Sequence, residues 1–155
     1  MTRTALPAPP TTAAIIKNTP FWPDVDLSTF CRALAPAVRV TPEMLKPMLL
    51  TAISEVNAEL YGFRVQQQQQ GYHALSQVPV MPPGGRGRRV GHYHQAIYCW
   101  LRAALSEWLP DGSTAAVSSR NEQARAEACG RLWRDAQRAI SRVQDAPYPT
   151  GESNR

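Results

Sequence analysis

The sequence predicts an all-α protein: a small helical bundle with three principal helices, one short helix and extended N- and C-terminal arms. In three long segments, apolar residues recur at steps of three and four, and no segment sustains the alternation typical of a strand. The chain has 155 residues, which is the usual size of one domain. Apolar residues make up 43% of it, so it can bury a core.

Prolines determine the prediction for the N-terminal part. Residues 1–14 hold three prolines among threonines and alanines, a composition that favours extended backbone, so we expect a flexible arm. Residues 15–26 are rich in large apolar side chains, but two prolines exclude a helix and a central strand. We expect an irregular segment that is pinned by Phe21 and Trp22.

A short helix follows this segment. Asp26 or Ser28 is suited to cap its N-terminus, and the helix runs to about Leu34 before Pro36 stops it.

The second helix is predicted to begin at Thr41, because a proline and an acid follow at positions that favour a helix start. From Leu45 onward, apolar residues lie on one face. Pro47 removes one backbone hydrogen bond, so we expect a bend in the first turns. The polar residues 66–70 continue the helix until Gly71 ends it.

The C-terminal half contains a long loop and two long helices. Residues 71–91 include five glycines and three prolines, which predicts the loop. Helical spacing then predicts one helix over about 91–109 and another over about 118–144. The helical domain therefore spans 15–147, and residues 148–155 form a polar tail.

The positive net charge favours a negatively charged partner but does not identify it. Lys and Arg number 17 and Asp and Glu 12, which gives a net charge of +5 and favours nucleic acid or an acidic protein surface. Most of the basic residues are arginines, which suit paired contacts at interfaces. Three cysteines at wide spacings exclude a disulfide scaffold and favour a reducing compartment. Without a signal peptide or an apolar span, we expect a soluble protein that is made in the cytoplasm.

The sequence contains no set of residues with the spacing of a catalytic or metal-binding site. His92 and His94 are two residues apart and point to different sides of a helix, and His73 is the only other histidine. Motifs for a nucleophile, a zinc protease or a phosphate loop are missing. We therefore expect no catalytic residue, no metal and no cofactor.

Two basic segments are candidates for contacts with a partner. In residues 84–89 the glycines give reach and Arg86, Arg88 and Arg89 give charge, so this segment is either a phosphate-contacting loop or a solvated one. The last predicted helix carries four arginines opposite its apolar face, interrupted only by Asp135: Arg131, Arg134, Arg138 and Arg142. This stripe is a solvated face, a phosphate-facing surface or an edge for an acidic neighbour. We assign the loop to DNA in a channel and the stripe to protein contacts.

Aromatic residues indicate contacts between chains. A small helical core does not bury all the large rings of this sequence, so some are expected to contact neighbouring subunits. We expect such anchors at both ends of the chain, Phe21 and Trp22 at one and Tyr148 with Pro149 at the other.

Several motifs in order resemble a known family. They are IKNT (16–19), FWPDVD (21–26), NAELY (57–61), GY (71–72), LWRD (132–135) and RVQD (142–145). From about Ile16 to Pro147, the chain resembles the head completion protein (gpL) family of temperate contractile-tailed phages.

The resemblance implies a structural role in the virion neck. Such a protein is an α-helical head-tail connector that joins the portal vertex after DNA packaging, closes the filled capsid and offers a platform to the next neck or tail-completion protein. The resemblance also implies assembly in the host cytoplasm, a ring of twelve subunits by analogy with the portal, and no enzymatic activity. The competing hypothesis is a small basic DNA-binding protein of packaging or regulation. Self-association separates the two, because a sequence-reading protein is expected to be a dimer.

Overall fold

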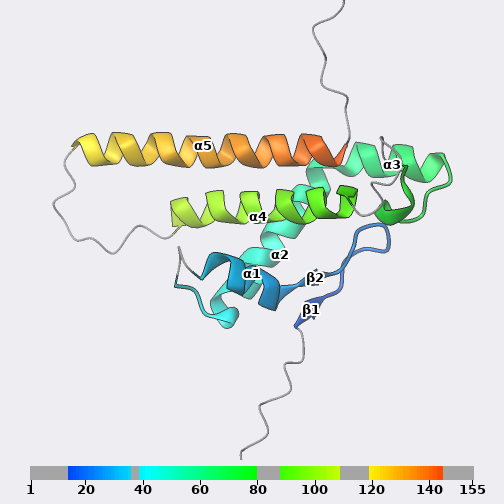
Figure 1. The fold of residues 1–155 in the computed structure, drawn as a ribbon, viewed down its shortest axis with the longest axis horizontal. Helices are drawn as coiled ribbons and strands as arrows, with labels where there is room; N and C mark the ends of the chain where they lie inside the picture. Colours follow the sequence, from blue (N-terminus) through cyan, green and yellow to red (C-terminus); the bar gives the residue numbers. More distant parts are fainter. Residues whose placement is uncertain (1–13, 36–38, 80–87, 109–118, 145–155) are drawn as a thin grey trace, which may run out of the picture.

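Two long antiparallel helices, α4 (Arg88–Trp108) and α5 (Ser119–Val143), pack along most of their length and form one side of the molecule (Figure 1). The computed structural model describes residues 14–35, 39–79, 88–108 and 119–144, with the side chains of 119–121 left out. The predicted arms at 1–14 and 148–155 fall outside these ranges, apart from Ala14. The all-α fold class is confirmed.

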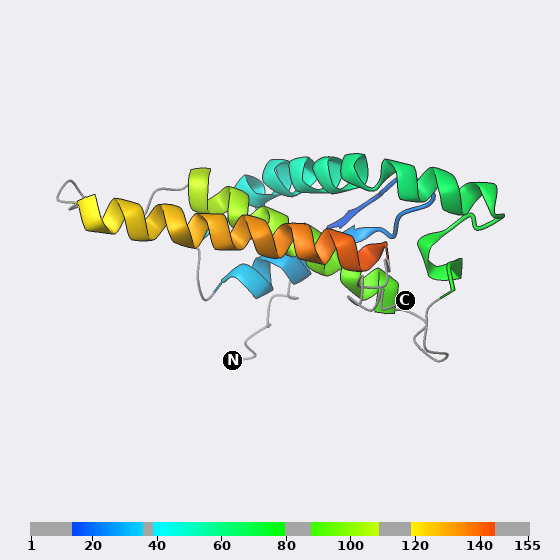
Figure 2. The ribbon, with the colours of Figure 1, turned by 90° about the horizontal axis from the view of Figure 1, so that it is seen from above.

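The third layer is α2 (Pro42–Glu59), which crosses α4 obliquely (Figure 2). The short helix α1 (Leu27–Leu34) packs against α2. As predicted, Thr41 caps α2, with its Oγ1 3.3 Å from the backbone nitrogen of Met44. The core lies where α2, α4 and α5 meet. Its fully buried side chains include Leu49, Ile97, Leu101 and Val143.

The single long second helix that we predicted is two helices. α2 ends at Glu59, and α3 (Tyr61–Gln69) begins after Leu60, whose ψ of 9° departs from the helical value. The Leu60 side chain is fully buried at this joint. Periodicity continues through the break, which explains why it left no signal in the sequence. The predicted end is confirmed, because Gly71 adopts a φ of 97° directly after α3.

Residues 15–26 contain a small sheet that was not predicted. β1 (Ile15–Ile16) and β2 (Val25–Asp26) pair antiparallel, with Ile15 opposite Asp26. Strands of two residues leave no alternation to detect.

The predicted loop 71–91 is shorter at its C-terminal end. A 3₁₀ turn, η1 (Leu75–Gln77), lies within it, and α4 begins at Arg88 rather than at Gly91. Arg88 and Arg89 are therefore helical. None of the helices in the described ranges combines the length and the apolar character needed to cross a membrane.

Candidate functional site

Three polar residues from distant parts of the chain form a closed set of hydrogen bonds. The amide of Asn18 donates to the Tyr93 hydroxyl at 2.7 Å, and this hydroxyl donates to Asn57 Oδ1 at 2.5 Å. The amide of Asn57 donates back to Asn18 Oδ1 at 3.0 Å. We call these three residues the polar clamp. It ties the loop between β1 and β2 to α2 and to α4.

Aromatic packing encloses the polar clamp. The Trp22 ring stacks on the Tyr93 ring with centroids 4.8 Å apart, and Phe21 meets Trp22 edge to face. Burial raises the pKa of the Tyr93 hydroxyl, so the hydroxyl keeps its proton and remains a donor. A fully buried hydroxyl with both hydrogen bonds made is suited to hold helices together rather than to transfer protons.

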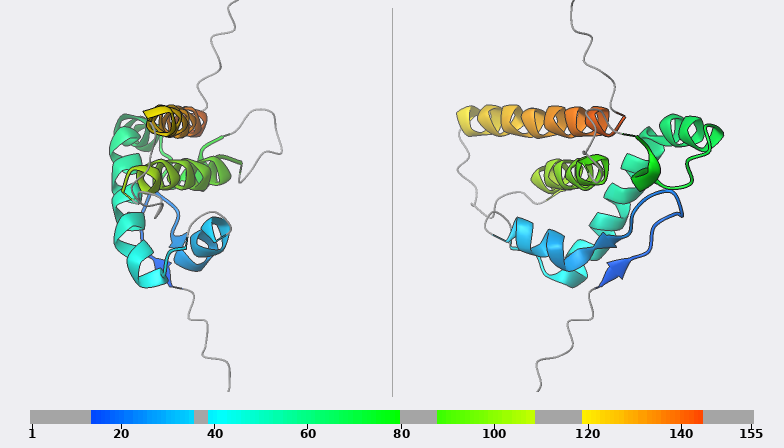
Figure 3. Two further views of the ribbon diagram at one scale, coloured as in Figure 1. Left: turned by 90° about the vertical axis from the view of Figure 1, so that its left-hand side faces the viewer. Right: turned by 45° about the vertical axis from the view of Figure 1, so that its right-hand side comes forward.

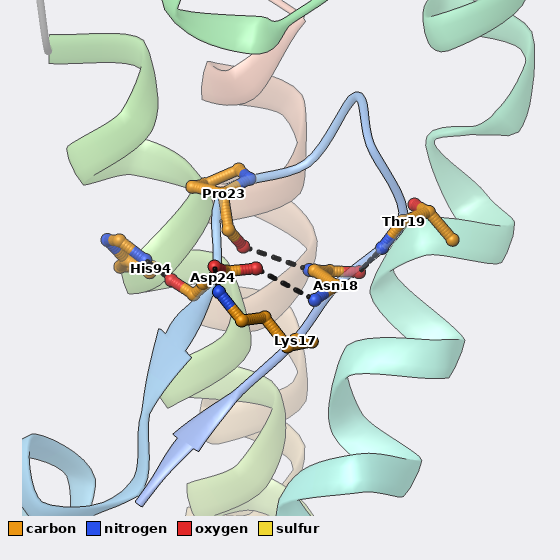
Figure 4. A network of polar contacts seen from close by, with 6 residues as sticks. All are labelled: Lys17, Asn18, Thr19, Pro23, Asp24 and His94. Carbon is orange, nitrogen blue, oxygen red and sulfur yellow. Dashed lines mark hydrogen bonds and ion pairs between the residues drawn. The ribbon is translucent and has the colours of Figure 1, made fainter. Parts of the chain in front are cut away.

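Asn18 also organises the loop itself (Figure 4). Its side chain donates to the Pro23 carbonyl at 3.1 Å, and its backbone N–H donates to Asp24 Oδ1 at 3.0 Å. Lys17 forms an ion pair with Asp24 at 3.1 Å. The Asn18 N–H and then Lys17 lower the pKa of the Asp24 carboxyl, so this group stays ionised.

A groove of about 300 Å³ lies between α1 and α4. Its walls combine the carboxylates of Asp24 and Asp26 with Phe30, His94 and Tyr98. The His94 Nε2 lies 3.4 Å from the Asp24 carbonyl oxygen, so the expected helix-start histidine contacts the loop. In the described part of the chain, no three Cys, His, Asp or Glu side chains are grouped to hold a metal. The three cysteines are all free thiols.

The DNA-channel candidates do not form one flexible loop. Arg88 is exposed on the first turn of α4, and Arg86 lies outside the described residues. Arg89 is only 5% exposed. Its guanidinium donates to the Val143 carbonyl at 2.8 Å and to the Pro79 carbonyl at 2.7 Å, and it lies over the Phe63 ring. Arg89 therefore binds its own chain and is not exposed to DNA in this conformation.

The arginine stripe, Arg131, Arg134, Arg138 and Arg142, is exposed along α5 as the spacing predicted. Arg138 lies 3.5 Å from Asp135, one turn away, in an exposed pair that contributes little stability. The stripe points away from α4, because the buried residues of α5 lie on the opposite face: Ala136, Ala139, Ile140 and Val143.

The expected aromatic anchors are placed differently. Phe21 and Trp22 are 2% and 3% exposed in the core of their own chain, so they are not available to a neighbour in this conformation. Both rings are enclosed because the β1–β2 pair turns the loop back onto α4. Tyr148 and Pro149 lie outside the described residues. The exposed tryptophan is Trp108, at the C-terminal end of α4.

Sequence reasoning missed the polar clamp. Asn18 and Asn57 do lie in the motifs that carry the family resemblance, but nothing in the sequence pairs them. Tyr93 fitted equally well as an ordinary member of the apolar face of α4.

Comparison with known proteins gives two results. Residues 16–152 match the family described as phage head completion protein (GPL). The chain is also 29% identical to the head completion/stabilization protein of Escherichia phage P2 over 142 residues, which cover 92% of this chain and 84% of that protein. No solved structure matches the chain. The chain thus belongs to the phage head completion protein (GPL) family and is a structural component of the virion with a role in completing the phage head.

Proposed function

We propose that the protein is the head-tail connector that binds the portal vertex once the DNA is packaged. There it stabilises the filled capsid and provides the platform to which the neck and tail attach. The observation that carries this proposal is the family match over residues 16–152, nearly the whole described fold. The phage P2 relative is named for both completion and stabilization of the head, which supports a role at a vertex that must be closed.

The surface of the structure supports binding to other proteins. The polar clamp lies inside the molecule and holds the fold together, whereas the arginine stripe faces outward. Arginines at fixed spacing on a helix suit paired contacts with carboxylates of a portal subunit or of a neighbouring copy. We propose that twelve copies form a ring on the portal.

Co-purification with the portal protein, followed by negative-stain imaging, tests this function. We expect rings on the portal, and we expect that loss of the gene leaves DNA-filled heads that leak and tails that remain unattached. Heads that stay stable and infectious without the protein would contradict the proposal.

A DNA contact inside the channel is a separate proposal, and Arg86 and Arg88 are its remaining candidates. Replacing both by Gln should leave ring assembly intact and alter DNA retention, because phosphate contacts depend on cationic side chains. Failure of this variant to assemble would assign the segment to protein contacts instead. Arg89 has to be left unchanged in the test, since it binds two carbonyls of its own chain.

A further inference from the structure

The outer face of α2 is unlike that of an ordinary surface helix. On the side away from the core lie eight exposed residues: Glu43, Met44, Pro47, Leu50, Thr51, Ser54, Glu55 and Ala58. Met44 and Leu50 are 49% and 45% exposed. A helix with apolar residues on both sides is typical of one that is covered on both sides. We call these eight residues the outer face of α2.

The two charged residues of this face are both negative, and the exposed Lys46 and Glu59 lie at its edges. Glu43 and Glu55 stand near its two ends, twelve residues apart, which is about 18 Å along a helix. Neither carboxylate forms an ion pair with any other residue in the described ranges. Apart from the two carboxylates near its ends, the outer face of α2 is therefore uncharged and mostly apolar.

The arginine stripe on α5 has the complementary character. Arg131 and Arg142 are eleven residues apart, about 16 Å along the helix, close to the separation of the two carboxylates. The aliphatic stems of arginine side chains pack on apolar surface while their guanidinium groups reach a carboxylate. Apart from the exposed contact between Arg138 and Asp135, the stripe forms no ion pair with the described residues.

One chain does not bring its own two surfaces together. α2 and α5 pack on different sides of α4 (Figure 3), and the hydrogen bond from Gln137 to Glu59 that joins them lies outside both surfaces. We infer that the outer face of α2 in one copy docks against the arginine stripe of the next copy. Because the two surfaces differ, the contact is head to tail, and repetition of such a contact gives a ring when the rotation between neighbouring copies closes on itself. The inference rests on the proposed connector function and names the subunit contact of its ring.

Charge reversal in the full-length chain tests this contact. One variant carries Arg131→Glu with Arg142→Glu, and a second carries Glu43→Arg with Glu55→Arg. Each alone brings like charges together, so we expect the concentration for half-assembly to rise at least about tenfold in sedimentation velocity. Mixed in equal amounts, the two variants present opposite charges at every contact in an alternating ring. We therefore expect the mixture to assemble as the wild type does.

Matched reversals on other exposed surfaces are the controls. Arg32→Glu with Arg39→Glu changes the charge by four units, as the reversal of the stripe does, and Gln66→Arg with Gln68→Arg adds two positive charges; none of these four residues belongs to either surface. We expect both control variants to assemble normally, alone and on the portal.

The outcomes separate the inference from the function on which it rests. If the wild type forms rings on the portal but the mixture of reversed variants does not recover, the α2–α5 contact is wrong and the connector function stands. If the mixture of the two variants forms dimers but no larger assembly, the head-to-tail arrangement is wrong. A wild type that stays monomeric with and without the portal would contradict the connector function itself.

Discussion

The hydroxyl of Tyr93 accepts a hydrogen bond from Asn18 and donates one to Asn57 in a fully buried position. Tyr93→Phe removes both hydrogen bonds and leaves the half-buried amide groups of Asn18 and Asn57 each with a missing partner. We expect the free energy of unfolding to fall by about 1–3 kcal/mol, measured by urea denaturation. Tyr61→Phe is the control, because Tyr61 is exposed, and it should change stability little. Equal stability of the two variants would show that the polar clamp does not hold the fold.

Arg89 and Arg88 are neighbours with opposite roles. Arg89→Lys keeps the charge but loses the planar fork that reaches the carbonyls of Pro79 and Val143 together, so we expect a loss of about 1–3 kcal/mol in the free energy of unfolding. Thermal unfolding measures the difference. Arg88→Lys, on the exposed side of the same turn, should be neutral. A neutral Arg89→Lys would mean that these carbonyls are served equally well by one ammonium group.

Asp24 gives a prediction for acid stability. The folded chain lowers the pKa of this carboxyl, so its contribution is present above the unfolded pKa and is lost as the pH falls through the folded value. Asp24→Asn should therefore lower the melting temperature near neutral pH. Below about pH 4 the difference in melting temperature between the variant and the wild type should become smaller. Melting temperatures measured from pH 7 to pH 2 check this. A constant gap across that range would argue against the ionised carboxylate as the cause.

The sequence does not show that Arg88 is exposed and Arg89 buried. Both belong to one basic segment, so charge and composition give them the same prediction. The carbonyls that select Arg89 lie 10 and 54 residues away in the chain, so only the fold distinguishes the two.

At the scale of elements, two glycines near α3 are predicted to respond in opposite ways. Gly62 lies inside the helix with nothing within 4 Å of an added Cβ, so Gly62→Ala should stabilise the chain by about 0.5–1 kcal/mol. Gly71 has a φ of 97°, where any other residue is strained, so Gly71→Ala should cost about 1 kcal/mol. Chemical denaturation of both variants provides the comparison. A stabilising Gly71→Ala would contradict the observed end of α3.

Helices were predictable where one apolar face repeats over many residues, as in α4 and α5. The joint at Leu60 was not, because its buried side chain fits the apolar period on both sides of the break. The β1–β2 pair was missed for the same kind of reason, since its strands are too short to show a period. Local pattern thus determines the long elements, and contacts between segments determine the short ones.

For the whole molecule, truncation at the C-terminus defines where the fold ends. A chain that ends at Asp145 keeps Val143 and its hydrogen bond with Arg89, so it should stay helical and as stable as the wild type. A chain that ends at Arg142 loses this buried side chain and the acceptor, which should cost at least about 2 kcal/mol. Circular dichroism and thermal melts distinguish the two. If both fold equally well, the contact between Arg89 and Val143 is dispensable.

The same shorter chain tests whether residues after Asp145 bind the portal. We expect the chain that ends at Asp145 to bind more weakly than the full-length protein, measured by occupancy of the portal vertex. Normal occupancy would exclude Tyr148 and Pro149 as anchors.

The candidate surfaces were only partly predictable from the sequence. Helical spacing was enough to place the arginine stripe, because its residues share one face of one helix. The outer face of α2 became visible only when the core identified which of its apolar residues are buried. A second apolar face and a core face look alike in the sequence.

The hydrogen bonds of Arg89 to two carbonyls also determine where two segments of the chain begin. Pro79 precedes the segment 80–87, and Val143 lies near the start of the C-terminal tail. Because Arg89 binds the carbonyls of both residues, the two segments start close together at one end of the molecule. An insertion directly after Pro79 and a tag fused directly after Gln144 would therefore begin at the same part of the subunit. If this end of the molecule lies at the DNA channel, the C-terminal tail starts beside the channel. If it lies at the portal, both the tail and the segment that contains Arg86 start at the portal.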